Sequence, residues 1–413
     1  MNSRFLLVCR PGRPGIGRRL SFEVCPVPDS AENIRVSKLG IVWGGNMRCL
    51  MTVGLLLAVA ASLLAQVPPS ETSLRWLDLP NPHLQVNGLP WYSENGGKLF
   101  RLPERLKDTY RKPVWELAQS PSGGRIRFRT DSPTLAIRLE YPSPPPDDTS
   151  MHAFGQAGVD LYIGQVYWGT VTADKSAKAG KVFEHCYFDL GGRPRIEREI
   201  TLYLPLYMPV KVLALGVDAQ ATMRPPRAFA LAKPVVFYGT SITQGGCASR
   251  PGMAYQAILG RRLNLDFVNL GFSGNGKGEP EVAQTAAAID AAAFVLDFAQ
   301  NNQSVAALQQ VYAPFIETLR AKHPDTPILA ITPIYSASEL LDSARNEGMR
   351  GLIRNVVSRR IADGDRNLQL VEGTDLLGPS RGDGLVDGTH PNDLGFEWMA
   401  EGLATRLAQV LGL

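Results

Sequence analysis

The sequence predicts an antiparallel β-sandwich followed by a three-layer α/β domain, both behind an N-terminal leader. Over residues 74–229, short segments of alternating apolar and polar residues succeed one another without helix-length patterns between them. After the proline pair Pro225-Pro226, apolar runs alternate with helix-length segments, which is typical of buried parallel strands joined by helices. We therefore assign residues 1–65 to the leader, 66–230 to the β-sandwich domain and 231–413 to the α/β domain.

An apolar run from Leu50 to Ala65 dominates the leader. It follows Arg48, is short for a membrane span and has the length of a signal-peptide core. Small residues near its end predict cleavage after Ala65, and hence a secreted or periplasmic protein without stable membrane insertion. An uncleaved N-terminal anchor is the alternative. Residues 1–46 have no clear periodicity, so we expect translation to begin at Met47 or Met51.

The distribution of charge argues against nucleic acid as a partner. The chain carries 43 Lys and Arg against 39 Asp and Glu, but eight of the basic residues and only three of the acidic ones lie in the leader. The remainder therefore holds 35 basic and 36 acidic residues. A nucleic-acid-binding domain would need a clear basic excess there.

Cys186 and Cys247 are the two cysteines that follow the leader, which excludes a disulfide framework. They fall in different predicted domains, so we expect two independent buried thiols. A single disulfide in an oxidising compartment stays the alternative. The five histidines are far apart in sequence and form no zinc-like cluster with the cysteines. We therefore predict no metal and no organic cofactor.

The predicted strands of the β-sandwich are separated by turn signals such as Ser-Pro and Gly-Gly. They are Arg125–Thr130, Thr134–Tyr141, Val159–Ile163, Glu199–Pro205 and Val210–Val217. Several such strands without helices between them are typical of a sandwich. Asp160 lies on one of these strands, and we expect it to anchor a turn or the interface between the two domains.

Five apolar runs predict the parallel strands of the α/β domain. They are Pro234–Gly239, Asp266–Gly271, Ala293–Ala299, Pro327–Thr332 and Leu368–Gly373. The predicted helices are Tyr255–Leu263, Glu279–Ala291, Val305–Lys322, Ala337–Ala362 and Leu394–Leu411. In such a fold the functional site sits at the carboxyl ends of the strands.

A serine follows the first of these strands directly, in Gly239-Thr240-Ser241-Ile242-Thr243. Thr243 occupies the second glycine position of the G-x-S-x-G nucleophile elbow, which disfavours an α/β-hydrolase. A serine at this place also fits a helix cap, so Ser241 by itself does not indicate catalysis.

Asp387 and His390 have the spacing that would activate Ser241. They lie three residues apart in Asp387-Gly388-Thr389-His390, just before the last helix. A serine hydroxyl is a weak nucleophile unless an imidazole takes its proton, and the imidazole needs an acceptor at its other nitrogen. An acid on the same short turn supplies that acceptor. The pattern predicts a Ser-His-Asp triad, with a capping aspartate and a surface histidine as the structural alternative.

Two loops after the following strands have residues suited to stabilising an oxyanion. The loop 269–276 is rich in glycine, so its backbone N–H groups can approach a ligand closely. The loop 297–302 carries amide side chains, while we interpret Asp297 itself as a buried hydrogen-bonding residue. Preorganised donors at a developing oxyanion lower the barrier by about 3–4 kcal/mol each. Their placement after consecutive strands is the informative part, because each loop alone is ordinary turn chemistry.

These four segments together resemble the four blocks of the SGNH hydrolase (GDSL-like lipase/acylhydrolase) superfamily, over nearly the whole α/β domain. The resemblance implies a flavodoxin-like, three-layer α/β/α SGNH hydrolase domain in which Ser241 is the nucleophile and Asp387 and His390 complete the triad. It also implies an oxyanion hole made by the backbone N–H groups of Ser241 and Gly274 and by the side-chain amide of Asn301.

The resemblance is tighter for the two-domain SGNH-type esterases that have an N-terminal GxDLY β-domain. It rests on the segment Gly239–Tyr255 and on Gly158–Tyr162, which reads GVDLY. Two departures stand out. Gly-Thr-Ser replaces the Gly-Asp-Ser of GDSL enzymes, although this subgroup usually lacks that aspartate. The third block reads Gln-Asn-Asn, which makes Asn302 a rival of Asn301.

The resemblance implies hydrolysis of carboxylic esters through an acyl-enzyme, with acetyl and other short acyl groups on carbohydrates as the expected substrates. The expected partner is accordingly a small-molecule or glycan ester. Two alternatives stay open: an O-acyltransferase that uses the same triad, and a non-catalytic carbohydrate-binding protein. The acyl chain length, the alcohol and the oligomeric state do not follow from the sequence.

Overall fold

The computed structural model describes residues 5–9, 22–26, 73–145, 148–172 and 179–413. The predicted signal-peptide core, its cleavage after Ala65 and the start at Met47 or Met51 lie outside these residues. Within the unit 1–66, strands β1 (Phe5–Cys9) and β2 (Phe22–Pro26) form an antiparallel pair. Both predicted domains lie in the second unit, residues 67–413. No helix in the described part of the chain has both the length and the apolar character needed to cross a bilayer.

Two antiparallel sheets make up the N-terminal domain, as the period-two alternation predicts. The first has the order β12-β5-β10-β7-β8, with β4 beside β5, and the second has the order β3-β11-β6-β9. The strands are β3 (Leu74–Asp78), β4 (Gln85–Asn87), β5 (Arg125–Thr130), β6 (Thr134–Glu140), β7 (Val159–Ile163), β8 (Val166–Val171), β9 (Val182–Asp189), β10 (Arg198–Tyr203), β11 (Lys211–Asp218) and β12 (Met223–Arg224). A shared core of residues from both sheets, such as Phe128 and Leu215, lies between them.

The second domain is a five-stranded parallel sheet in the order β14-β13-β15-β16-β17. Its strands are β13 (Val235–Gly239), β14 (Phe267–Gly271), β15 (Ala293–Asp297), β16 (Ile328–Ile331) and β17 (Leu368–Val371). This order, with the first strand between the second and third, is that of flavodoxin-like folds and places the functional crevice at the carboxyl ends of the strands. The predicted fold class is confirmed.

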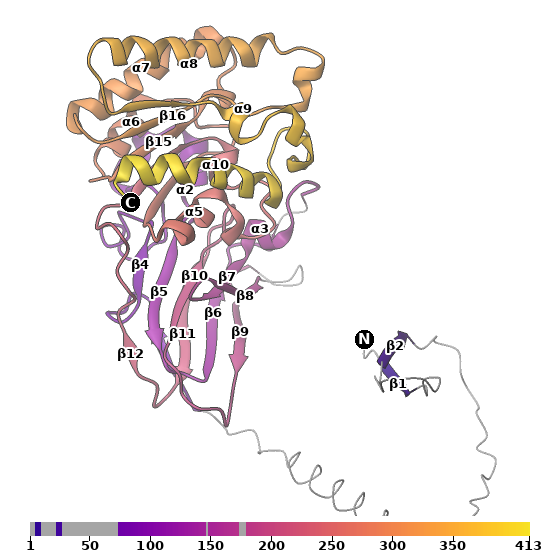
Figure 1. Cartoon of the computed structure of the whole chain (residues 1–413). Coiled ribbons are helices and arrows are strands. Elements are labelled where there is room, and N and C mark those ends of the chain that lie inside the picture. Colours follow the sequence, from indigo (N-terminus) through magenta and orange to yellow (C-terminus); the bar gives the residue numbers. More distant parts are fainter. Residues whose placement is uncertain (1–4, 10–21, 27–72, 146–147, 173–178) are drawn as a thin grey trace, which may run out of the picture. The chain divides into compact units, whose positions relative to one another are not determined.

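Helices cover both faces of this sheet, which explains why its strands are apolar throughout (Figure 1). On one face lie α5 (Tyr255–Leu263) and α10 (Asp393–Leu411). On the other lie α6 (Pro280–Ala287), α7 (Val305–Lys322) and α8 (Ala344–Ala362). Residues of β13 alternate between the two cores, with Phe237 on the first face and Tyr238 on the second. Shorter helices are α4 (Ser241–Gln244), α9 (Gly373–Leu376), η2 (Pro251–Met253), η3 (Ala299–Asn301), η4 (Ala337–Leu340) and η5 (Pro379–Gly384).

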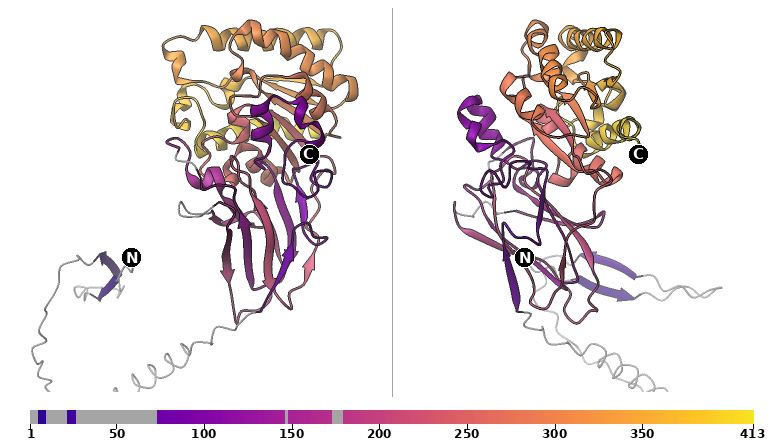
Figure 2. Two further views of the ribbon diagram at one scale, coloured as in Figure 1. Left: turned by 180° about the vertical axis from the view of Figure 1, so that it is seen from behind. Right: turned by 90° about the vertical axis from the view of Figure 1, so that its left-hand side faces the viewer.

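Helices also occur within the N-terminal region, where the sequence predicts none. They are η1 (Glu104–Thr109), α2 (Lys112–Ala118) and α3 (Ala153–Ala157). Helix α2, purple in Figure 2, lies beside the α/β domain, and its residues Val114 and Ala118 belong to the core that α6, α7 and α8 form with the sheet. The expectation of strands alone is therefore wrong here. This short helix gains its stability from packing against the other domain, which local patterning does not reveal.

Asp160 on β7 joins the two domains, as expected. Its carboxylate is fully buried and accepts hydrogen bonds from the N–H of Gly252 at 2.7 Å and from Nη1 of Arg250 at 3.0 Å, both in the α/β domain. Thr170 Oγ1 donates to the other oxygen at 2.7 Å. A buried carboxylate of this kind is stable only with such partners. The G-x-D-L-Y element is thus a contact between domains.

Cys186 and Cys247 are both free thiols, which excludes a disulfide between them in this structure. Cys186 lies exposed on β9 and Cys247 is half-buried in the loop after α4. The expectation that both are buried is therefore wrong for Cys186. Cys186 lies on the face of β9 that points away from the sandwich core, together with Val182 and Glu184, and is therefore exposed.

Candidate active site

Ser241 stands at the carboxyl end of β13, where it begins helix α4. The preceding Thr240 caps this helix by accepting a hydrogen bond from the N–H of Ile242. Gly239 has no room for a side chain, because a Cβ there would lie 2.0 Å from Thr243 Oγ1. The tight turn leaves Ser241 8% exposed at the carboxyl end of the sheet, where such folds place their functional site.

The structure brings Ser241, His390 and Asp387 into one hydrogen-bonded chain. Ser241 Oγ lies 2.8 Å from His390 Nε2, and His390 Nδ1 lies 2.7 Å from Asp387 Oδ2. The Nδ1–H tautomer satisfies both contacts, since Nε2 then accepts from the serine hydroxyl and Nδ1 donates to the carboxylate. This is the geometry in which an imidazole can take a proton from a serine.

Asp387 is held firmly by backbone groups of its own turn. Its Oδ1 accepts hydrogen bonds from the N–H of Thr389 at 2.9 Å and from that of His390 at 2.8 Å. Although partial burial acts in the opposite direction, these donors and the imidazole hold the pKa of Asp387 below its ordinary value. The carboxylate is therefore ionised at neutral pH and fixes the orientation of the ring.

Two backbone N–H groups near the serine have no acceptor among the described residues: those of Ser241 and Gly274. Gly274 is exposed, has a φ of +65° and has no atom within 4 Å of where a Cβ would be. The turn is held by Phe272, whose carbonyl accepts from the N–H groups of Asn275 and Gly276 at 2.9 and 2.8 Å. With this positive φ, the Gly274 N–H stays outside the hydrogen bonds that Phe272 accepts. It can therefore donate to a ligand.

The structure separates the two candidate amides. Asn301 is half-buried, and its Nδ2 donates to the Phe272 carbonyl in the loop of Gly274 at 3.2 Å. Asn302 is 4% exposed, and its Nδ2 donates back to the carbonyl of Phe298 at 3.3 Å. Asn301 therefore lies at the predicted oxyanion hole and Asn302 turns away from it. The catalytic role of Asn301 stays a prediction.

Gln244 and Tyr207 are part of the site but were not identified from the sequence. Gln244 is fully buried: its Nε2 donates to the carbonyl of Leu206 at 3.0 Å, and its Oε1 accepts from the N–H of Ser273 at 2.9 Å. The hydroxyl of Tyr207 donates to the Ser241 carbonyl at 3.3 Å. The β-domain thus supports both the serine helix and the Gly274 loop. Gln244, three residues after Ser241 and just before two glycines, was the one local signal.

Asp297 is a buried carboxyl below the serine helix, as interpreted from the sequence. It is 1% exposed and accepts weak hydrogen bonds from Thr243 Oγ1 at 3.3 Å and Gln300 Nε2 at 3.4 Å. Burial raises the pKa of Asp297 to about 7. The folded state therefore binds this proton more tightly than the unfolded chain does. The stability that protonated Asp297 contributes is fully present below its ordinary pKa of 3.8 and is lost as the pH rises through 7.

Asp297→Asn is expected to remove this pH dependence. Between pH 5 and pH 8 the free energy of unfolding of the natural protein should fall by about 3 kcal/mol relative to that of the variant. Urea unfolding of both proteins at the two pH values measures the difference, and the pairing cancels the other titrating groups. The same pH dependence in both proteins would mean that Asp297 is ionised at pH 5.

Cys247 is the third member of a possible metal-binding group with Asp387 and His390. In the part of the chain that the structure describes, this is the one such group, and its ligand atoms lie within 4.8 Å of one another. Both imidazole nitrogens are already hydrogen-bonded, to Ser241 and Asp387. Burial raises the pKa of the Cys247 thiol to about 11, which disfavours the thiolate that a metal would need. We assign no metal here.

Comparisons with known proteins agree with this geometry. Residues 232–408 match the GDSL-like lipase/acylhydrolase family, and residues 74–223 match the N-terminal GxDLY domain of SGNH hydrolase-type esterases. A Bacteroides ovatus protein described as a GDSL-like lipase is 32% identical with a TM-score of 0.72, covering 82% of this chain and 98% of its own. No curated protein matches the sequence.

Two further solved structures share the architecture. The salicylyl-acyltransferase SsfX3 from a tetracycline biosynthetic pathway is 25% identical with a TM-score of 0.68, covering 82% of this chain and 98% of its own. A family two carbohydrate esterase from Clostridium thermocellum, solved with cellohexaose, is 15% identical with a TM-score of 0.55, covering 70% of this chain and 93% of its own. At that identity the likeness concerns the fold alone.

Proposed function

Because this chain belongs to the GDSL-like lipase/acylhydrolase family, with the N-terminal domain of SGNH-type esterases, we propose that it is an exported serine esterase that removes short acyl groups from carbohydrates. The observation that carries the chemistry is the hydrogen-bonded chain from Ser241 Oγ through His390 to Asp387. Beside it lie two N–H groups that have no acceptor among the described residues. These are the parts that acyl transfer needs: a nucleophile, a base with an orienting acid, and donors for an oxyanion.

In the acylation step, Ser241 Oγ attacks the ester carbonyl carbon while its proton passes to His390 Nε2. The carbonyl π electrons move to the oxygen, which accepts hydrogen bonds from the N–H groups of Ser241 and Gly274 and from the Asn301 amide. Collapse of this intermediate breaks the bond to the alcohol oxygen, which takes the proton from His390. The acyl group stays on Ser241, and the imidazolium formed in between is stabilised by Asp387.

In the deacylation step, water takes the place of the alcohol. His390 Nε2 removes a proton from the water as its oxygen attacks the acyl carbon, and the same donors hold the second oxyanion. Collapse returns the electron pair to the carbonyl and breaks the bond to Ser241 Oγ, which recovers its proton from His390. A carboxylic acid leaves, and the enzyme is as it began.

The substrate class rests on two lines of support. The fold is shared with family two carbohydrate esterases and with an acetyl xylan esterase from Butyrivibrio proteoclasticus. The apolar run Leu50–Ala65 supports export to where glycans are found. N-terminal sequencing of the mature protein tests the export, with Gln66 expected as its first residue.

Hydrolysis of p-nitrophenyl acetate and p-nitrophenyl octanoate by the mature chain tests the acyl preference, and acetate release from an acetylated xylo-oligosaccharide tests the alcohol. We expect kcat/KM for the acetyl ester to exceed that for the octanoyl ester by about tenfold or more, because each methylene that finds no matching pocket costs binding energy in the transition state. Faster cleavage of the octanoyl ester would contradict a short-acyl specificity.

Acyl transfer to a sugar hydroxyl is the second candidate, and the likeness to the salicylyl-acyltransferase favours it. The same triad would serve, because only the acceptor of the acyl group differs. Adding a free sugar to the acetyl ester assay separates the two by mass spectrometry of the products. Free acetate as the main product supports the esterase, and acetylated sugar as the main product supports the transferase.

A further inference from the structure

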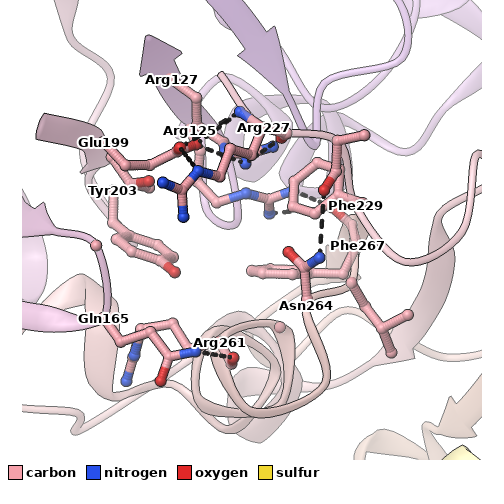
Figure 3. Close-up of a pocket in the computed structure, with 15 residues that line it drawn as sticks. Arg125, Arg127, Gln165, Glu199, Tyr203, Arg227, Phe229, Arg261, Asn264 and Phe267 are labelled. Carbon is pink, nitrogen blue, oxygen red and sulfur yellow. Dashed lines mark hydrogen bonds and ion pairs between the residues drawn. The ribbon is translucent and has the colours of Figure 1, made fainter. Parts of the chain in front are cut away.

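A cavity of about 400 Å³ lies between the two domains, away from the triad (Figure 3). Strands β5 and β10 and the turn after β7 line it from the β-domain, and the end of α5 with the start of β14 line it from the α/β domain. This is the amino end of β14, whereas Gly274 follows its carboxyl end. A five-residue strand separates the two ends by about 13 Å. The cavity is therefore a different place from the proposed active site.

Positive charge is in excess around this cavity. Four arginines and a single glutamate line it, and Asp266 lies just behind. The four arginines are Arg125, Arg127, Arg227 and Arg261. Arg125 is 2% exposed and is matched by its ion pair with Asp266. Even when both carboxylates are counted, two positive charges are left without a counter-charge.

Arg127 and Arg227 share one carboxylate. Arg127 Nη2 donates to Glu199 Oε1 at 3.2 Å, and the backbone N–H of Arg227 donates to the same oxygen at 3.0 Å. The Arg227 guanidinium is 80% exposed and reaches Glu199 only at 3.8 Å. Arg127 is 6% exposed, with its guanidinium 3.9 Å from the ring centre of Phe229, so its position is fixed.

Arg261 has no acidic partner in the described part of the chain. Its guanidinium lies 4.4 Å from the ring centre of Tyr162 and 5.5 Å from that of Tyr203. Its Nη1 is buried without a hydrogen-bond partner among the described residues. This nitrogen is not accessible from the cavity, so what Arg261 offers a ligand there is the positive charge of its guanidinium. Arg261 is thus a lining residue whose charge no carboxylate of the described residues neutralises.

The rest of the wall is aromatic and neutral polar. Tyr203, Phe229 and Phe267 present rings, while Gln165 and Thr201 present an amide and a hydroxyl. Figure 3 shows Arg125, Arg127 and Glu199 on one side of the cavity and Gln165 and Arg261 on the opposite side. Arginines suit a carboxylate, and aromatic rings with a few polar groups suit the mixed apolar and hydroxylated faces of a sugar ring.

We propose that this cavity binds an acidic saccharide, whose carboxylate is held by the unmatched arginines and whose ring lies among the aromatic side chains. The volume lies in the lower part of the range of small-molecule sites, which fits a monosaccharide unit. The site is separate from the proposed ester hydrolysis, since no residue that lines it takes part in that reaction. Binding and hydrolysis can therefore fail independently in an experiment.

Calorimetric titration of the full mature protein with sodium glucuronate tests the proposal, with glucose and sodium acetate as matched ligands at equal ionic strength. We expect glucuronate to bind at millimolar concentrations or below, and both matched ligands to bind at least about tenfold more weakly. Arg261→Gln should weaken glucuronate binding by about tenfold or more, because it removes charge-assisted hydrogen bonds. Arg227→Gln, at an exposed position, is the second variant and should weaken it as well.

Arg262→Gln is the control, since Arg262 is the next residue on α5, pairs with Glu397 and does not line the cavity. It should bind glucuronate as the natural protein does. All three variants should keep their activity on p-nitrophenyl acetate, which shows that they are folded. Absence of glucuronate binding, equal binding of glucose, or unchanged affinity in both Arg261→Gln and Arg227→Gln would overturn the proposal. Acetate binding as strong as that of glucuronate would overturn its saccharide part.

Discussion

Ser241→Ala is expected to lower kcat for p-nitrophenyl acetate by about 10⁴- to 10⁶-fold. Ser241 Oγ is the protein atom that bonds to the acyl carbon in the proposed mechanism, so its loss removes the acyl-enzyme route. What activity remains would come from water activated by His390 and from the donors around Gly274. KM should change little, because Oγ contributes to the transition state and hardly to binding of the ester.

The variant should fold normally, since the removed hydroxyl makes its one side-chain contact with His390. Ser249→Ala is the matched control: Ser249 follows in the same segment, but its hydroxyl donates to Asp393 on α10 at 2.5 Å and does not reach the triad. Its kcat should stay within about threefold of the natural value. A Ser241→Ala protein with a tenth or more of the natural kcat would exclude Ser241 as the nucleophile.

Asp387→Asn should lower kcat by about 10⁴-fold near pH 7, although it changes the side-chain shape hardly at all. The reason is local. The Oδ1 position accepts from two backbone N–H groups, those of Thr389 and His390, so an asparagine must place its carbonyl oxygen there. Its NH₂ group then faces His390 Nδ1 and forces that nitrogen to accept. The proton moves to Nε2, which can no longer take a proton from Ser241.

The outcome that would contradict this account is a kcat reduced less than about tenfold. The structure would then have to hold the imidazole tautomer by some group other than Asp387. The thermal unfolding midpoint of the variant is expected to be close to that of the natural protein at neutral pH. This measurement shows whether activity is lost through the wrong histidine tautomer or through unfolding. A kcat that falls together with stability would make Asp387 a structural residue of the turn.

Much of the α/β domain could be predicted from the sequence because its signals are local. Helices α5 and α7 begin and end at the predicted residues, and all five parallel strands lie within the predicted runs. The predicted helix over 337–362 is in fact two elements, η4 and α8, separated by a turn. The residues from Leu341 to Ser343 separate the two helices. The apolar spacing continues across them, so it does not predict the interruption.

The sandwich was predicted less completely. Strands β8 and β9 carry few buried positions, so alternation is weak there, and β4 and β12 are too short to leave a pattern. Helix α2 was not predicted, because the residues that it packs against belong to the other domain. In each case, what stabilises the element lies on a distant part of the chain.

The sequence by itself determined the fold class and the residues able to do chemistry, because apolar periodicity and the three-residue spacing of Asp387 and His390 are properties of neighbouring residues. Only the tertiary structure decided which distant groups meet. It places Ser241 Oγ 2.8 Å from a histidine 149 residues away and turns Asn301 rather than Asn302 toward the Gly274 loop. It also places Arg261 at a cavity between the domains with no acidic partner among the described residues. Such contacts depend on strand order and on how the two domains pack, and no short-range pattern encodes either.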